Sequence, residues 1–217
     1  LNQAFLGGAL QQGRIQLNGA LNQFPFKHQG GRFVVSAKLS DFDLHFAPHW
    51  LPLTHMNGRV SFINDGLVIH AVQSRLSSSA FSSVRARIPH LAVPHLSVHA
   101  IGGGDLGLAL RVLKLSPLAI GKRLSKLQAK GRYHLNLGLK LDLHRHHSQV
   151  QGRIALVHDR LSLSSAKLHL SHVSGFLDFT KRSIRSRDLN AVWKSVPLQI
   201  HVGTQIRTGH RAVNITT

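Results

Sequence analysis

The most constraining feature of this sequence is an unbroken alternation of polar and apolar residues from Arg132 to His144. Successive side chains of a β-strand point to opposite faces, so strict alternation predicts a strand with one apolar face and one solvated face. At roughly 3.3 Å per residue such a strand is about 40 Å long, which demands long neighbours. The apolar positions are Tyr133, Leu135, Leu137, Leu139, Leu141 and Leu143.

Other segments repeat this pattern and supply the neighbours. Phe33 and Val35 begin one alternation, which slips by one residue at Ser40–Asp41 and indicates a bulge or a tight turn there. A second clean alternation contains Leu198, Ile200 and Val202. Between two apolar runs, Asn64-Asp65-Gly66 is a hairpin signal. The fold class is therefore mostly β, with long antiparallel strands.

Helical spacing replaces alternation only between Asp105 and Gln128. Leu106, Leu110 and Leu113 recur at helical intervals, and Ser116-Pro117 is a favourable start for a second helix. We expect two short helices near 105–128, a first β-meander at 1–104 and a second at 129–217. The chain lacks an initiator Met and stops inside an alternating pattern, so we expect it to be a segment of a longer protein.

Composition narrows the function classes. Lys and Arg total 27 against 8 Asp and Glu, a formal net charge of +19, which predicts attraction to anions. Aromatic residues make up only 6%, too few for the stacking platforms of nucleic-acid binders, so no nucleic-acid partner is expected. There is no Cys, and we find no convincing catalytic or metal-ligating constellation. We expect no enzyme activity, no cofactor and no metal.

Several short motifs follow one another in an order that resembles one family. They are Phe24-Pro25-Phe26, Gly30-Gly31-Arg32-Phe33, Ala47-Pro48-His49-Trp50-Leu51-Pro52-Leu53, Gly58-Arg59-Val60-Ser61-Phe62, Arg87-Ile88-Pro89-His90-Leu91, Leu113-Lys114-Leu115-Ser116-Pro117-Leu118 and Gly175-Phe176-Leu177-Asp178-Phe179. From Gly19 to Thr217 the chain resembles the YhdP branch of the AsmA-like proteins, the TamB-related, bridge-like lipid transfer proteins.

The resemblance implies a long periplasmic protein of Gram-negative bacteria, anchored in the inner membrane by parts outside this segment. It also implies a taco-like β-sheet, curled into an open apolar groove. Its function would be non-enzymatic transport of phospholipid between the inner and the outer membrane.

The residue pattern suggests where such a groove would lie. We expect its lining to be Tyr133, Leu135, Leu137, Leu139, Leu141, Leu143, Phe33, Val35, Leu198, Ile200 and Val202, with Arg132 and Lys140 as a head-group rim. An alternative is an envelope-assembly scaffold whose apolar face packs permanently against a protein partner.

Overall fold

The computed structural model describes residues 5–26, 30–45, 51–115, 124–144, 147–164, 167–207 and 210–216. In these residues the strands form an open antiparallel sheet with the order β1-β2-β3-β4-β5-β6-β8-β9-β10-β11-β12-β13, and β7 pairs with β9. The predicted fold class, mostly β with long antiparallel strands, is confirmed. No helix among the described residues has the length and apolarity needed to cross a membrane.

Contacts divide the chain into two compact units. Unit 1 comprises Leu1–Ile101 and Gly138–Gln149, and unit 2 comprises Gly102–Leu137 and Val150–Thr217. The strands β6, β8 and β9 contribute residues to both units. The division of this chain into a first meander at 1–104 and a second at 129–217 stays a prediction.

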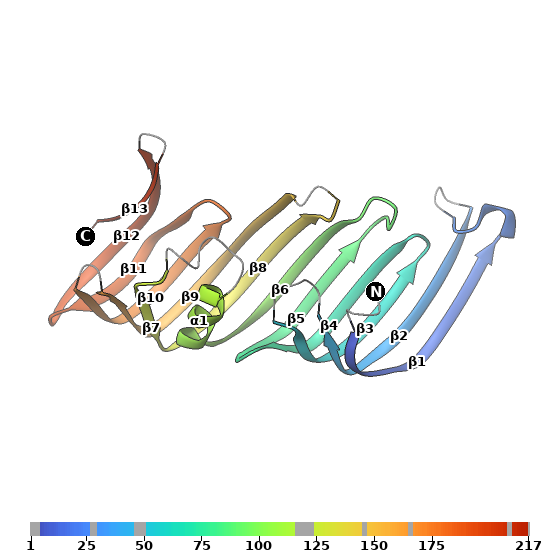
Figure 1. Cartoon of the computed structure of the whole chain (residues 1–217), viewed down its shortest axis with the longest axis horizontal. Helices are drawn as coiled ribbons and strands as arrows, with labels where there is room; N and C mark the ends of the chain where they lie inside the picture. The colour runs from blue at the N-terminus through green and yellow to red at the C-terminus, as the bar shows by residue number, and fades with distance from the viewer. Residues whose placement is uncertain are drawn as a thin grey trace. The chain divides into compact units, whose positions relative to one another are not determined.

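Unit 1 is a meander in which each strand pairs with the next one along the chain (Figure 1). Its elements are β1 (Phe5–Gly19), the short 3-10 helix η1 (Leu21–Gln23), β2 (Gly31–Leu44), β3 (Leu53–Ile63), β4 (Gly66–Leu76), β5 (Ser79–Ile88), most of β6 (His95–Asp105), the end of β8 (Arg132–Asp142) and the start of β9 (His147–Leu163). The turn between β3 and β4 is the predicted hairpin, and Asn64 adopts a φ of 53° in it. Asn is among the few residues that tolerate this left-handed region.

The predicted slip at Ser40–Asp41 is a β-bulge. The register between β2 and β3 shifts between Leu39 and Phe42, and Asp41 has a φ of 48°. Asn57 Oδ1 accepts a hydrogen bond from the backbone of Asp41 (3.0 Å), and the Asp41 carboxylate lies 2.7 Å from the His55 ring. The extra residue keeps Leu39 and Phe42 on the same, buried side of β2.

Unit 2 contains the α-helix and the remaining strands. Its elements are α1 (Leu106–Leu115), β7 (Leu127–Lys130), the start of β8 (Arg132–Asp142), most of β9 (His147–Leu163), β10 (Leu168–Thr180), β11 (Ile184–Trp193), β12 (Val196–Arg207) and β13 (His210–Thr216). The carboxylate of Asp105 accepts a hydrogen bond from the backbone of Leu108 (2.7 Å) and so caps α1.

The prediction of two helices near 105–128 was wrong in part. The described residues of this region hold one α-helix, and Leu127 belongs to strand β7, where it pairs with Leu163 of β9. Pairing with a long neighbour outweighs helical spacing in so short a segment. The predicted helix start at Ser116-Pro117 lies outside the described residues.

A buried carboxylate stabilises the bulge of β9 in unit 2. Asp159 has no exposed surface (0%), and it accepts hydrogen bonds from the backbone N–H groups of Arg132 (2.7 Å) and Val157 (2.9 Å). Its neighbour His158 takes a φ of 55°. The side chain therefore satisfies two donors that the bulge removes from the sheet ladder.

Candidate functional site

One face of unit 1 carries a row of apolar side chains at matched register across β1 to β5. The register pairs run Ile15 with Val35, Val35 with Phe62, Phe62 with Leu67, and Leu67 with Ile88. We call Ile15, Val35, Phe62, Leu67 and Ile88 the open apolar row. Ile15 is 72% exposed and Phe62, on the inner strand β3, is 42% exposed. A large aromatic side chain on an inner strand, next to the β3–β4 hairpin, thus stays uncovered, which marks a contact surface.

The same face is buried nearer the bulges. Four residues along each strand from the open apolar row, Leu39, Ala71 and Val84 are only 3%, 0% and 8% exposed. Gly58 completes that row, and a Cβ there would lie 2.2 Å from the carbonyl oxygen of His70. The face of unit 1 is consequently packed near the bulges and open at the other end of the strands.

Phe33, a predicted lining residue, belongs to an aromatic group at the edge of this face. Its ring centroid lies 5.1 Å from that of Phe24, and Phe24 lies 6.1 Å from the buried Phe26. A Cβ at Gly31 would come within 2.4 Å of the Phe26 ring, so this position requires glycine. These contacts give the Phe24-Pro25-Phe26 and Gly30-Gly31-Arg32-Phe33 motifs a common physical role.

The apolar side chains that were predicted to share one face of β8 become more exposed from Tyr133 toward Leu143. Tyr133 is buried, and the next four ladder residues, Leu135 to Leu141, are half-buried. Leu143 is 43% exposed and lies in the turn after β8, because the strand ends at Asp142 and not at His144. Tyr133, Leu135 and Leu137 belong to unit 2, whereas Leu139, Leu141 and Leu143 belong to unit 1.

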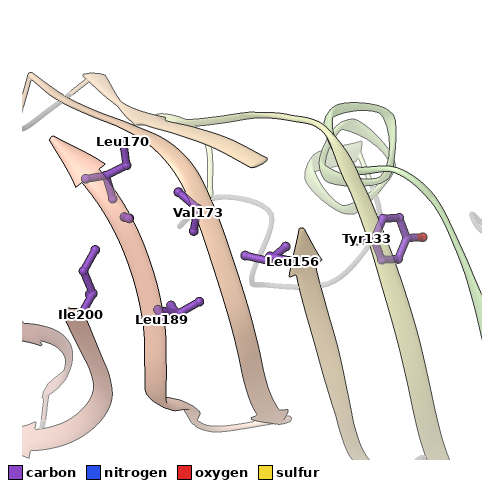
Figure 2. Close-up of a cluster of buried hydrophobic side chains, with 7 residues drawn as sticks. Tyr133, Leu156, Leu170, Val173, Leu189 and Ile200 are labelled. Atoms are coloured by element: carbon purple, nitrogen blue, oxygen red, sulfur yellow. The ribbon is translucent and has the colours of Figure 1, made fainter. Parts of the chain in front are cut away.

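The apolar face of unit 2 contains a packed core, and only next to the turn between β11 and β12 do Trp193 and Val196 remain 39% and 54% exposed among its described residues. Side chains from β8, β9, β10, β11 and β12 form a buried group, which we call the covered cluster (Figure 2). Leu106 and Ala109 of α1 pack against it, as do the predicted lining residues Leu135, Leu198 and Val202. Its members are Tyr133, Leu156, Leu170, Val173, Leu189, Ala191 and Ile200. The predicted lining residues Tyr133 and Ile200 therefore contribute to a packed core.

The predicted rim residues Arg132 and Lys140 are both exposed. They occupy the strand parity opposite to the ladder and lie near the two ends of β8. Arg132 follows Gly131, which has a φ of 136° and where a Cβ would clash with the Asp159 carboxylate, so this position requires glycine.

The solvated face of unit 2 holds a bidentate ion pair. The guanidinium of Arg153 donates to both carboxylate oxygens of Asp178, at 2.6 and 2.9 Å. This hydrogen bonding lowers the pKa of Asp178 and raises the pKa of Arg153. Both side chains are more than half exposed, so solvent screens the attraction.

No group of three or more His, Cys, Asp or Glu side chains that could hold a metal occurs in the described part of the chain. The Asp41–His55 pair lies on the exposed surface and has a bulge-stabilising partner in Asn57. The candidate site is the apolar face of unit 1 with its open apolar row.

Sequence reasoning named Phe33 and Val35 as lining residues of this face, and it did not name Ile15, Leu67 and Ile88. Alternation at Val60-Ser61-Phe62 carried a signal for Phe62. It did not show which residues of other strands stand beside Phe62, because bulges set that register.

An open antiparallel sheet that keeps apolar rows uncovered on one face defines a class of β-proteins that present an extended apolar surface. The sequence model of a family described as YhdP protein matches residues 1–217, and the chain belongs to this family.

Among curated proteins, the chain is 27% identical over 207 residues to the protein of Escherichia coli (strain K12) named "Intermembrane phospholipid transporter YhdP". The match covers 94% of this chain and 16% of that protein, so the chain spans only a small part of its relative's length. No solved structure matches the chain.

Proposed function

We propose that this chain is a section of a phospholipid conduit whose apolar face covers acyl chains during transfer between two membranes. The observation that carries the proposal is the open apolar row, in which Phe62 stays 42% exposed within the sheet of unit 1. The name of the Escherichia coli relative, an intermembrane phospholipid transporter, supports the same cargo. No chemical step is required, because the cargo only moves.

The energetics of acyl chains explain why such a face is needed. Burying one methylene group is worth about 0.8 kcal/mol, so a chain of roughly sixteen carbons costs about 13 kcal/mol when it is exposed to water. A face that offers apolar side chains at each register step removes most of this cost along its length. The head group stays in water throughout.

The lining favours sliding over trapping. The open apolar row consists of aliphatic side chains and one Phe, and the ladder of β8 is almost entirely Leu. A uniform surface gives a lipid similar binding energy at successive positions, so no deep minimum holds it. Arg132 and Lys140 have long side chains that can extend past the ends of β8 and attract phosphate weakly.

The whole-protein setting is part of the proposal. We place the conduit in the periplasm of a Gram-negative cell, with inner-membrane anchoring supplied outside this chain. Lipid then moves between the inner and outer membranes without crossing water.

The experiment is a lipid-transfer assay and lipid mass spectrometry on the full-length protein that contains this section. Replacing Leu137 and Leu139 with Asp should abolish transfer and remove co-purified phospholipid while the sheet still folds. The matched control replaces His134 and Asn136 with Asp on the opposite face of β8, and it should retain most transfer. Wild-type-like transfer by the Leu137→Asp, Leu139→Asp variant would contradict the proposal, as would a tightly bound protein on this face in place of lipid.

A further inference from the structure

The solvated face of unit 1 carries a row of basic side chains directly opposite one another on four adjacent strands. The register pairs Lys38 with Arg59, Arg59 with His70, and His70 with Arg85. We call these four residues the basic row. Each occupies the strand position next to a residue of the apolar face, so the basic row lies on the other side of the sheet. At about 4.8 Å between strands, it is roughly 14 Å long.

This arrangement is unfavourable for the isolated sheet. Lys38 and Arg59 carry like charges directly opposite one another on neighbouring strands, and such charges repel. Within the described residues, the ion pairs of unit 1 involve Asp41, Asp65 and Asp142, and none includes a member of the basic row. In unit 2 the comparable row reads Arg153, Asp178, Arg185, with a carboxylate between the two cations. The basic row therefore has a charge pattern that an external anion would neutralise.

The row ends in a shallow hollow of about 310 Å³. His70 and Arg85 line it together with Arg87 and His99, and Ser97 contributes a hydroxyl group that donates to the carbonyl oxygen of Arg87 (3.4 Å). The guanidinium groups of Arg85 and Arg87 are donors that phosphate oxygens accept from in proteins, and the apolar side chains of Val68, Ile69 and Ala86 form the rest of the lining. The hollow is thus suited to a phosphate-bearing head group.

We propose that the basic row and its hollow bind the anionic phospholipid head groups of a membrane surface, on the face of unit 1 opposite to the lipid-covering face. This membrane-contact site is separate from the conduit and does not depend on it. The basic side chains form a line along an open sheet face. This shape suits a surface that carries many charges better than it suits one small enclosed ion.

Two exposed apolar side chains favour a lipid surface over an acidic protein. Val72, two residues beyond His70 on β4, is 59% exposed, and Ile101, two residues beyond His99 on β6, is 52% exposed. Apolar side chains that flank basic residues on one face are typical of surfaces that rest in the head-group region of a bilayer. Anionic lipids are also mobile, so they adjust to whatever spacing the cations have.

The test measures binding of the full-length protein to vesicles of phosphatidylcholine alone and of phosphatidylcholine mixed with phosphatidylglycerol. Reversing two members of the row, Arg59→Glu with Arg85→Glu, should lower partitioning onto the anionic vesicles at least tenfold. Added salt should weaken the wild-type binding in the same direction. The matched control, Arg160→Glu with Arg187→Glu on unit 2, makes the same change in net charge and should bind almost as well as wild type.

Folding is checked separately with Arg59→Gln, which removes a repulsive neighbour and should leave stability equal to or above that of wild type. Equal losses of vesicle binding in the two double variants would overturn the proposal, because they would show an effect of net charge alone. Retained binding by Arg59→Glu with Arg85→Glu would overturn it too. So would wild-type binding to polyglutamate or inorganic phosphate without binding to the anionic vesicles.

Discussion

Unit 1 and unit 2 use the same antiparallel architecture but treat their apolar faces differently. In unit 2 the face is a packed cluster in which Val173 is 1% exposed, and α1 lies against it. Unit 1 also buries side chains such as Leu39, Met56 and Ala71, but Phe62 in its open apolar row remains 42% exposed. The difference teaches that apolar alternation serves two purposes in this protein, because it builds a stabilising core in both units and leaves part of the face of unit 1 available.

The largest expected effect is the difference in stability between two variants, one with a charge in the covered cluster of unit 2 and one with a charge in the open apolar row of unit 1. Val173→Asp puts a carboxylate into the covered cluster and should lower the free energy of unfolding by about 4 kcal/mol or more, enough to prevent folding. Phe62→Asp in the open apolar row should cost about 1 kcal/mol, because the charge remains in water. Urea unfolding of the two variants makes the comparison. Equal destabilisation would show that the face of unit 1 is also a core.

A smaller effect probes the cover that α1 provides. Leu110 is 7% exposed and Leu108 is 36% exposed on the same helix. Leu110→Ala should lower the free energy of unfolding by about 2–3 kcal/mol through the cavity it leaves, whereas Leu108→Ala should cost less than about 1 kcal/mol. Thermal unfolding followed by circular dichroism distinguishes the two variants. Similar shifts in melting temperature for both would mean that α1 does not pack against the sheet of unit 2.

The smallest effect concerns the solvated face of unit 2. Hydrogen bonding from Arg153 lowers the pKa of Asp178 in the folded protein, so the folded state binds this proton less readily than the unfolded chain does. The stabilisation is therefore complete above the unfolded carboxyl pKa and is lost as pH falls through the lower, folded value.

Asp178→Asn should consequently reduce the melting temperature slightly at neutral pH and have no effect in strong acid. Melting curves recorded from neutral pH down to strong acid test this sign. A difference that grows toward acid pH would contradict it.

Sequence reasoning captured what is local in this fold. Alternation identified β8 and the face its Leu residues share, the slip at Ser40–Asp41 identified a bulge, and Asn64-Asp65-Gly66 identified a hairpin. These features depend on neighbours along one strand or one turn, where side-chain direction follows directly from position.

The features that define the candidate site depend on register between strands. Alternation places Phe62 on the apolar face, but only the bulges decide that it stands beside Val35 and Leu67. The same holds for Arg59 between Lys38 and His70. Leu124 and Leu127 lie three residues apart, a spacing that fits a helix but also fits a turn followed by a strand, and they lie in a turn and in strand β7.

The most direct test of the central claim is site-specific photo-crosslinking in cells that express the full-length protein. A photoreactive residue is placed at Phe62 in the open apolar row, at Asn190 on the solvated face of unit 2, or at Val173 in the covered cluster, and crosslinked phospholipid is quantified. The account predicts strong lipid crosslinking at position 62 and little at positions 190 and 173 when transfer is in progress. Absence of lipid at position 62, or equal crosslinking at all three positions, would contradict it.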